Sequence, residues 1–305
     1  MRRRALLSTG VAVATAGCFG FGSGCSRSAT LDLSAVSDAD VADAASDSPD
    51  SLSPPERDAL AAARRDEAPT MWSVGDPFSS VEYVVVDGTY YVVETSAESA
   101  VERPGYALSL DADDATPDGS LRSVTFDDLP AVDRTALFAA LGYPSPREMT
   151  RYERAHSISM GGTLAYPTDD AESRSELVPE PSFDVLRIAG RDFRMDVGEP
   201  RQVIVEQFHV GVRTVAATPG ELAAIIYERD GIDLDDRSLS AEQRDIVETA
   251  IDEGYDECAP YSDAFADLQE DFGWVGSSSH DARDTADYAN YRDEWYAVDL
   301  FEAVA

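Results

Sequence analysis

Apolar residues recur with helical spacing in three segments of similar sequence. The segments are residues 52–63 (LSPPERDALAAA), 239–250 (LSAEQRDIVETA) and, as a looser copy, 129–140 (LPAVDRTALFAA). In the first two, Ser53 and Ser240 are expected N-caps, and Glu56 and Gln243, three residues later, complete a capping box. The pattern therefore predicts a short helix that begins at the same point of each segment.

Downstream of each helical segment, the pattern predicts two strands joined by a tight turn. These stretches are residues 84–94, 185–196 and 290–299. In the first, Asp87-Gly88 is a dipeptide favoured in two-residue hairpins. An aromatic residue follows the turn at equivalent positions, as Tyr91, Phe193 or Tyr296. We infer three degenerate helix-plus-hairpin units, each too small to be stable alone. Chance similarity among acidic amphipathic helices is the competing explanation.

Other periodic stretches complete the expected fold. Strands are predicted at 106–110, 121–126, 203–208 and 210–216, and helices at 146–156, 218–229 and 262–272. Strands in meanders with helices between them predict the α+β class, with antiparallel sheets packed by short helices. The expected organisation is an export signal (1–17), a flexible acidic tether (18–51) and three α+β units (52–142, 143–235 and 236–305).

The expected tether is rich in Gly, Ser, Ala and Asp and shows no sustained apolar periodicity. Such a composition cannot bury enough apolar surface to offset the entropy lost on ordering. We therefore expect a flexible, self-repelling segment that holds the folded part away from the membrane.

The N-terminus has the layout of an export signal. Arg2, Arg3 and Arg4 precede an apolar run, 5–16, which is too short to span a bilayer stably, and small residues then lead to Cys18. This pattern predicts a signal that is removed after export. The alternative is a frayed helix at the start of a cytosolic protein.

Two short motifs in this segment resemble known signals. Arg3-Arg4, followed by Ala-Leu-Leu, resembles a twin-arginine export signal, and Thr-Ala-Gly before Cys18 resembles a lipoprotein processing box. The resemblance implies export, cleavage before Cys18, a lipid on its thiol, and attachment to the outer face of the cell membrane.

Charge is the unusual property of the composition. The chain has 59 acidic and 24 basic residues and a formal net charge of −35, which becomes −38 if the three N-terminal arginines are removed. Every basic residue is Arg, and the acidic residues are spread along the whole chain, which disfavours a single domain built for a basic partner. Nucleic-acid binding is also disfavoured, because no basic stripe is present to displace counterions from phosphate.

Self-repulsion of this strength strains a fold at low salt but is screened at molar salt, where the Debye length is about 3 Å. The composition is similar to that of proteins from extreme halophiles. Together with Arg3-Arg4 and residues 15–18, it makes the chain resemble the twin-arginine-exported lipoproteins of haloarchaea.

Three cysteines, Cys18, Cys25 and Cys258, cannot form a disulfide framework. If Cys18 carries a lipid, Cys25 and Cys258 remain and could pair across the fold. Because Cys25 lies in the expected tether, we favour a free Cys258 that packs as a small hydrophobic residue.

The sequence contains no specific catalytic or phosphate-binding motif, and we expect no metal and no cofactor.

Three weaker candidates for a site are rejected. Residues 277–281 (SSSHD) place a hydroxyl, an imidazole and a carboxylate in sequence order, which does not produce triad geometry. Residues 111–119 are acidic but lack the sixth-position glycine and the distal Glu of an EF-hand loop. Residues 206–209 place Glu and His on opposite faces of a predicted strand. The histidines are scattered, at His156, His209 and His280.

The aromatic residues of two hairpins are the remaining candidate for a contact surface. Alternation sends one member of each adjacent pair, Tyr90-Tyr91 and Trp295-Tyr296, inward and the other outward. Packing in a core is the alternative role for all four.

Two classes of function follow. The first is a lipid-anchored, non-enzymatic protein of the cell envelope, which binds an envelope protein or glycan or serves as a structural spacer. The second is an extracytoplasmic enzyme, such as a hydrolase, whose site is assembled from distant segments.

Overall fold

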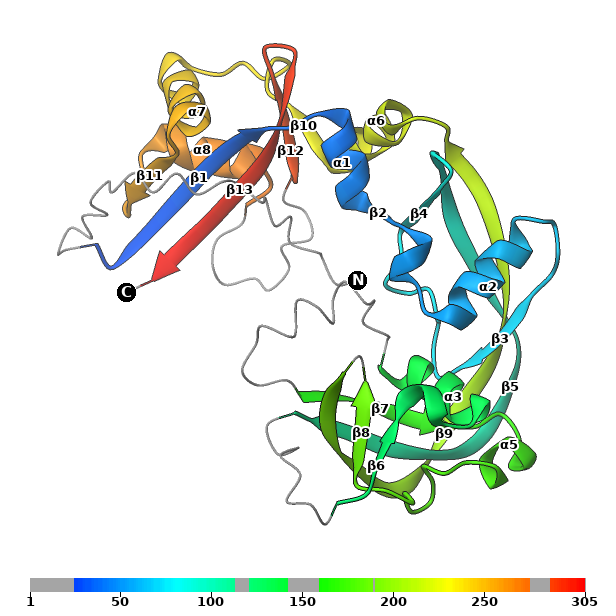
Figure 1. Cartoon of the computed structure of the whole chain (residues 1–305). Helices are drawn as coiled ribbons and strands as arrows, with labels where there is room; N and C mark the ends of the chain where they lie inside the picture. Colours follow the sequence, from blue (N-terminus) through cyan, green and yellow to red (C-terminus); the bar gives the residue numbers. More distant parts are fainter. Residues whose placement is uncertain (1–24, 113–120, 142–158, 189, 275–285, 305) are drawn as a thin grey trace. The chain divides into compact units, whose positions relative to one another are not determined.

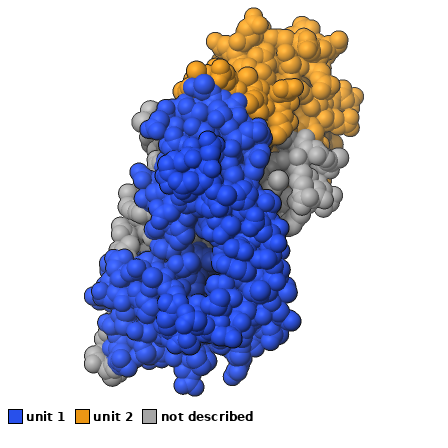
Figure 2. Space-filling view, turned by 90° about the vertical axis from the view of Figure 1, so that its right-hand side faces the viewer, with its two compact units in different colours: residues 1–3, 45–217 blue, residues 4–44, 218–305 orange. Residues whose placement is uncertain are grey.

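The computed structural model describes residues 25–112, 121–141, 159–188, 190–274 and 286–304, and these form two compact units (Figure 1). Unit 1 comprises residues 45–217, and unit 2 comprises residues 25–44 together with 218–304, apart from the gaps named above. Figure 2 colours unit 1 blue and unit 2 orange. Unit 2 is therefore discontinuous in sequence, with unit 1 inserted between its two parts.

Unit 1 is built around a long antiparallel ribbon of two strands, β5 (Thr89–Asp111) and β9 (Arg191–Ala216). The order in its sheet is β2-β4-β5-β9-β8-β6, with β3 on β9 and β7 on β5. The other strands are β2 (Ser46–Asp47), β3 (Thr70–Ser73), β4 (Tyr83–Val86), β6 (Ser123–Thr125), β7 (Ser159–Ala165) and β8 (Val185–Ile188). The helices are α2 (Pro54–Ala63), α3 (Ala131–Leu141) and α5 (Asp169–Ser173), with 3-10 turns η1 (Pro49–Ser51) and η2 (Phe126–Asp128).

Among the described residues of unit 1, two hydrophobic clusters stabilise the fold. One includes Leu60 of α2 with Val84 and Val210, and the other includes Leu137 of α3 with Leu186 and other buried residues. A polar network lies beside the second cluster: the Tyr166 hydroxyl donates to the fully buried Asp133 carboxylate at 2.7 Å, and the Glu176 amide donates to the same carboxylate at 2.8 Å. Because that buried charge is hydrogen-bonded, it is compatible with the core.

Unit 2 is a five-stranded sheet in the order β10-β12-β13-β1-β11. Its strands are β1 (Arg27–Ala35), β10 (Gly231–Asp233), β11 (Tyr255–Cys258), β12 (Tyr288–Tyr291) and β13 (Glu294–Val304). Its helices are α6 (Pro219–Asp230), α7 (Ala241–Asp252), α8 (Asp263–Asp271) and all but the last residue of α1 (Asp38–Ala45). Helices α7 and α8 contribute Val247, Phe265 and Leu268 to a core that also contains Leu31 and Leu33 of β1.

The same order of elements occurs three times among the described residues. Each copy has a short strand, a helix, an edge strand and a hairpin, and the short strand pairs in parallel with the first strand of the hairpin. The first copy (46–111) is β2-α2-β3-β4-β5, the second copy (123–216) is β6-α3-β7-β8-β9, and the third copy (231–304) is β10-α7-β11-β12-β13. In their described residues, copies two and three each contain one more helix, α5 or α8.

The first and second copies are related by a local pseudo-two-fold axis that passes through the β5–β9 ribbon. Glu102 follows the turn residue Gly88 by 14 positions, Ile204 follows the turn residue Gly190 by 14 positions, and these two residues face each other in the β5–β9 pairing. The copies also exchange edge strands, because β3 of the first pairs with β9 of the second, and β7 of the second pairs with β5 of the first. Unit 1 is thus an intrachain pair of equivalent copies.

Several sequence predictions are confirmed. The α+β class is correct, and Ser53 and Ser240 close capping boxes with Glu56 and Gln243. The Arg four residues after each cap donates to the carbonyl of the preceding Leu, from Arg57 to Leu52 at 3.2 Å and from Arg244 to Leu239 at 2.6 Å. The turn residues Asp87-Gly88 and Arg292-Asp293 have positive φ, as two-residue hairpins require. Helices α6 and α8 form where helices were expected at 218–229 and 262–272, and Thr218 and Ser262 are their N-caps.

Other predictions are corrected. Residues 27–51 are not a tether, because β1, α1 and β2 form there and Leu31 is fully buried. The three predicted unit boundaries also differ from the structure: α3 belongs with the second hairpin, and two compact units replace three. The two strands expected at 203–208 and 210–216 are parts of the single strand β9. The helix expected at 146–156 lies outside the described residues.

In the part of the chain that the structure describes, no helix is both long enough and apolar enough to cross a membrane.

Candidate functional site

The residues predicted to direct export and anchoring lie outside the described part of the chain. They are Arg3, Arg4 and Cys18, and their roles stay predictions. The same holds for the polar stretch 277–281 and for His156 and His280.

Two other weak candidates are described in part or in full. Of the acidic stretch 111–119, residues 113–119 lie outside the described residues, and Asp111 ends β5 opposite Ser159 and Arg194. Glu206 and His209 lie on β9, as expected for a strand, and His209 faces Thr70 and Ser96 across the sheet. Among the described residues, no group of three or more His, Cys, Asp or Glu side chains could hold a metal ion.

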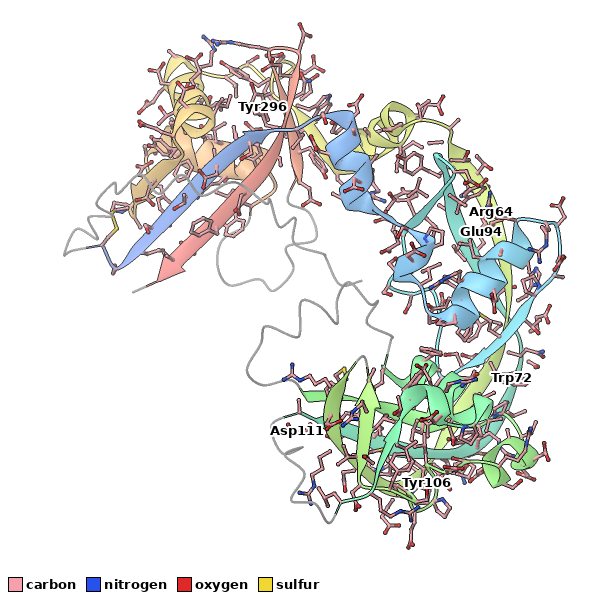
Figure 3. All side chains as sticks on the ribbon, in the orientation of Figure 1. Arg64, Trp72, Glu94, Tyr106, Asp111 and Tyr296 are labelled. Carbon is pink, nitrogen blue, oxygen red and sulfur yellow. A yellow bond between two sulfur atoms is a disulfide. The ribbon has the colours of Figure 1, made fainter. Side chains whose placement is uncertain are left out.

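The first aromatic pair divides as the alternation predicts. Tyr90 is buried, with 7% of its surface exposed, and Tyr91 is half-buried on the other face of β5. Arg64 lies at the end of α2 (Figure 3). Its guanidinium carbon lies 5.2 Å from the centroid of the Tyr91 ring and partly covers that ring. Arg64 also contacts the Asp87 carboxylate at 3.4 Å. The outward ring of this hairpin therefore lies under a cation.

The second aromatic pair divides in the same way, but its outward member is packed. Tyr296 is buried, and its hydroxyl donates to Glu294 at 2.8 Å. The Trp295 ring stacks on Tyr227 of α6 with 4.0 Å between centroids and an interplanar angle of 1°. A Cβ at Gly231 would lie 2.9 Å from Cζ3 of Trp295, so the glycine makes room for this stack.

The four predicted contact residues are divided between the two units. Tyr90 and Tyr91 belong to unit 1, whereas Trp295 and Tyr296 belong to unit 2. Two of the four rings are buried and a third is stacked, which leaves Tyr91 as the ring best placed to contact a partner. A binding role for these residues stays a prediction.

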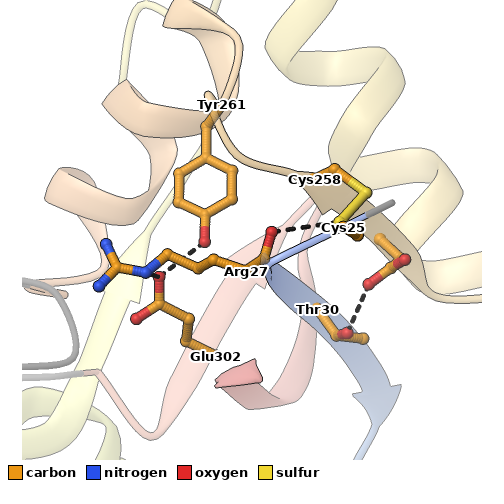
Figure 4. Close-up of a disulfide and its surroundings, with 7 residues drawn as sticks. Cys25, Arg27, Thr30, Cys258, Tyr261 and Glu302 are labelled. Atoms are coloured by element: carbon orange, nitrogen blue, oxygen red, sulfur yellow. Dashed lines mark hydrogen bonds and ion pairs between the residues drawn. A yellow bond between two sulfur atoms is a disulfide. The ribbon is translucent and has the colours of Figure 1, made fainter. Parts of the chain in front are cut away.

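The most distinctive chemistry among the described residues is a disulfide that joins Cys25 to Cys258, 233 positions apart in sequence (Figure 4). The expectation of a free, buried Cys258 was wrong, because Cys25 leads into β1 and β1 pairs with β11. Ser28 lies opposite Cys258 in that pairing, and a bend at Ser26, just before β1, turns Cys25 back toward Cys258. The contact of 3.2 Å between the Cys25 sulfur and the Arg27 carbonyl is not a hydrogen bond, since an oxidised sulfur carries no proton.

Polar side chains surround the disulfide end of the sheet. Arg27 of β1 pairs with Glu302 of β13 at 3.1 Å, and the Tyr261 hydroxyl donates to Glu302 at 2.7 Å. Burial, followed by the neighbouring Glu302 carboxylate, raises the pKa of Tyr261 to about 12. Only 5% of the Glu302 side chain is exposed, so Arg27 supplies the charge that balances a nearly buried carboxylate.

Farther along the same sheet, two carboxylates face each other. Asp32 of β1 lies opposite Asp299 of β13. Burial raises the pKa of Asp32, and repulsion from Asp299 raises it further. An acid whose pKa is higher in the folded state binds protons more tightly there, so its protonation stabilises the fold as the pH falls through that raised pKa.

We predict that Asp32→Asn raises the melting temperature of unit 2 by about 2 °C near neutral pH, since it removes one member of the repelling pair without changing the side-chain volume. The gain shrinks at acidic pH, where the wild-type side chain is already protonated, and at higher salt, where repulsion is screened. Thermal unfolding at two pH values and two salt concentrations measures both trends. Asp43→Asn, at an exposed position of α1, removes the same charge as a control. Equal gains from both variants would contradict the specific role of the pair.

Comparison of the sequence with protein-family models and with curated proteins, and of the structure with solved structures, finds no match.

Proposed function

We propose that this chain is a lipid-anchored protein of the cell envelope that works outside the membrane as a binding or structural module. The observation that supports this proposal best is the Cys25–Cys258 disulfide. Disulfides form and persist in oxidising environments outside the cytosol and are rare in reducing compartments. The bond therefore favours the same location as the export and processing motifs at the N-terminus.

The disulfide also sets a limit on the distance between the anchor and the body. Cys25 follows Cys18 by seven positions, and seven fully extended residues span at most about 25 Å. Because the disulfide joins Cys25 to Cys258 of β11, a lipid on Cys18 would hold unit 2 close to the membrane surface. Residues 27–51, which composition assigned to the tether, cannot lengthen this connection because they form β1, α1 and β2.

The charge pattern is consistent with this location in a saline environment. With a net charge of −35, the protein repels other acidic polymers at low salt, and high salt screens this repulsion. We propose an envelope protein or glycan as the partner of the module, with the half-buried Tyr91 as one contact residue. The other class of function, an extracytoplasmic hydrolase, has no specific observation in its favour among the described residues.

The anchoring part of the proposal is tested by Cys18→Ser. We expect the wild-type protein in the membrane fraction and the variant either released into the medium or retained with its signal uncleaved, because the lipid-accepting thiol is absent. Fractionation of cells in high-salt buffer, with mass determination of the N-terminus, measures both outcomes.

The matched control is the double variant Cys25→Ser, Cys258→Ser, which removes the other thiols and leaves Cys18. The control is expected to stay in the membrane fraction. Membrane association of Cys18→Ser that equals the wild type, in a chain whose signal has been removed, would count against lipid attachment. An intact N-terminal methionine with an unmodified Cys18 in the natural protein would contradict the whole proposal.

A further inference from the structure

Strand β1 occupies a position in unit 2 that a strand of another copy occupies in unit 1. In unit 1, the first copy and its neighbour give the strand order β2-β4-β5-β9-β3. In unit 2, the order is β10-β12-β13-β1-β11. Each strand of the third copy corresponds to one of the first, and β1 stands where β9 of the second copy stands. We call the place between β13 and β11 the β1 position.

In unit 1, the equivalent position in each copy is filled by a strand of the other copy. The first copy does not pair its edge strand β3 with its own long strand β5, but with β9 of the second copy. The second copy does the reverse, with β7 on β5. In both cases the strand between a copy's long strand and its edge strand is supplied by the other copy. The third copy has no such neighbour in unit 2, and β1 supplies the missing strand.

All of the contacts described below join β1 to residues of the third copy. Nine of its residues pair with β13 and four pair with β11. Ala29, Leu31 and Leu33 are at most 3% exposed and belong to the core of unit 2. The Thr30 hydroxyl donates to Asp256 at 2.9 Å. None of these contacts depends on which chain supplies the strand, because each joins β1 to residues of the third copy.

The charge of β1 makes it a better occupant of the β1 position than the acidic segments of this protein. The strand carries one Arg and one Asp, so its side chains add no net charge to a unit that is rich in carboxylates. Its Arg27 pairs with Glu302, which is nearly buried on β13. A strand without a cation at that point would leave the Glu302 carboxylate unbalanced.

The covalent link between β1 and the rest of its own chain is short. Two residues, Val36 and Ser37, separate β1 from α1, and the Val36 amide donates to the Trp295 carbonyl at 3.0 Å. Ser37 and Asp40 form a reciprocal cap at the start of α1. A change in direction at these two residues would carry the whole strand into another molecule, and exchange of an identical element is a low-cost way to form a dimer.

We propose that the β1 position is an interaction site for a second copy of this chain, which two molecules fill reciprocally by exchanging their β1 strands. Each exchanged strand makes the same contacts in the partner that it makes in its own molecule. Cys25 of one chain then lies beside Cys258 of the other, so the disulfide becomes intermolecular. This inference concerns unit 2 alone and does not depend on the lipid.

A pair of complementary cysteine variants tests the exchange. Both full-length chains carry Cys18→Ser, and one also carries Cys258→Ser, whereas the other carries Cys25→Ser and a different affinity tag. Neither chain can close the disulfide within itself. The two are mixed in denaturant, refolded together in molar salt, and oxidised with oxidised glutathione, which accepts two electrons and two protons from the Cys25 and Cys258 thiols and leaves as two reduced molecules.

The expected product is a covalent heterodimer that contains a Cys25–Cys258 peptide from the two chains. The matched control moves the thiol of the first chain to the other end of the strand, with Cys25→Ser and Ser34→Cys. Ser34 is exposed, but it lies opposite Ala297 and far along the strand from the partner of Cys258. If random collisions formed the disulfide, the control thiol would link to Cys258 as readily as Cys25 does. Strand exchange is expected to give about tenfold more heterodimer with Cys25 than with the control, because the exchanged strand holds Cys25 at a high effective concentration near Cys258.

A heterodimer that forms with Cys25 and not with the control supports the proposal. Equal yields from the two thiols, or no heterodimer while circular dichroism shows that each variant is folded, would overturn it. Variants that do not fold are replaced by the wild-type chain, refolded as a mixture of isotopically labelled and unlabelled molecules. In that mixture, an interchain Cys25–Cys258 peptide supports exchange, and purely intrachain peptides contradict it.

Discussion

Replacing Leu31 with alanine is expected to lower the free energy of unfolding of unit 2 by about 3 kcal/mol while that of unit 1 stays unchanged. Leu31 is fully buried between the sheet and its helices, and removal of a buried leucine side chain loses transfer free energy and leaves a cavity. Hydrogen exchange followed by mass spectrometry resolves the two units, because peptides from residues 239–304 report on unit 2 and peptides from residues 83–111 report on unit 1.

The control for this prediction is Ser34→Ala, an exposed position on the same strand. It is expected to change the protection of either unit little. If residues 18–51 were a flexible tether, Leu31→Ala and Ser34→Ala would have equally small effects. That result would contradict the assignment of β1 to the core of unit 2.

Removal of salt is expected to unfold both units. The net charge of −35 is distributed over the whole chain, and lowering the salt from about 1 M to about 10 mM lengthens the Debye length from about 3 Å to about 30 Å. Repulsion among the carboxylates then acts across the whole molecule and destabilises the compact state. Far-UV and near-UV circular dichroism during stepwise dilution of the salt measures the loss of secondary and tertiary structure.

A non-ionic osmolyte separates screening from general stabilisation. Sucrose favours compact states because it is excluded from the protein surface, but it does not screen charge. We therefore expect sucrose to preserve much less structure than molar sodium chloride. A spectrum that stays native in dilute buffer without either additive would show that the adaptation to brine inferred from composition is wrong.

The local parts of the fold could be predicted from sequence because their causes are local. A serine cap with Glu or Gln three positions later fixes where α2 and α7 begin, and the interaction is complete within four residues. The two-residue turn at Asp87-Gly88 likewise depends on the φ preferences of two residues. The similarity of these local signals was sufficient to indicate a repeat, although its boundaries were misplaced.

The role of the N-terminal segment could not be predicted in the same way. Residues 29–33 alternate between apolar and polar side chains, which is the signal of a half-buried strand, but the stretch is short and lies within a composition typical of disorder. Its partners β11 and β13 are more than 200 positions away. The disulfide was missed for the same reason, since Cys25 comes near Cys258 only because β1 pairs with β11 and the chain bends at Ser26.

The division of the aromatic pairs was predicted correctly from alternation, but their packing was not. That one ring of each pair is buried follows from strand geometry, whereas the choice of Tyr90 and Tyr296 depends on which face of each strand meets the core. The stack of Trp295 on Tyr227 depends on where α6 lies and on the absence of a side chain at Gly231. No local pattern in the sequence specifies either condition.

The insertion of unit 1 within unit 2 has a consequence for biosynthesis. A ribosome makes β1 first, whereas the strands on both sides of it, β11 and β13, are made after all of unit 1. During most of translation, Ala29, Leu31 and Leu33 therefore have no core to enter, while unit 1 already has every strand that it needs. Unit 1 can fold as the chain grows, but unit 2 must wait until the last strand has left the ribosome.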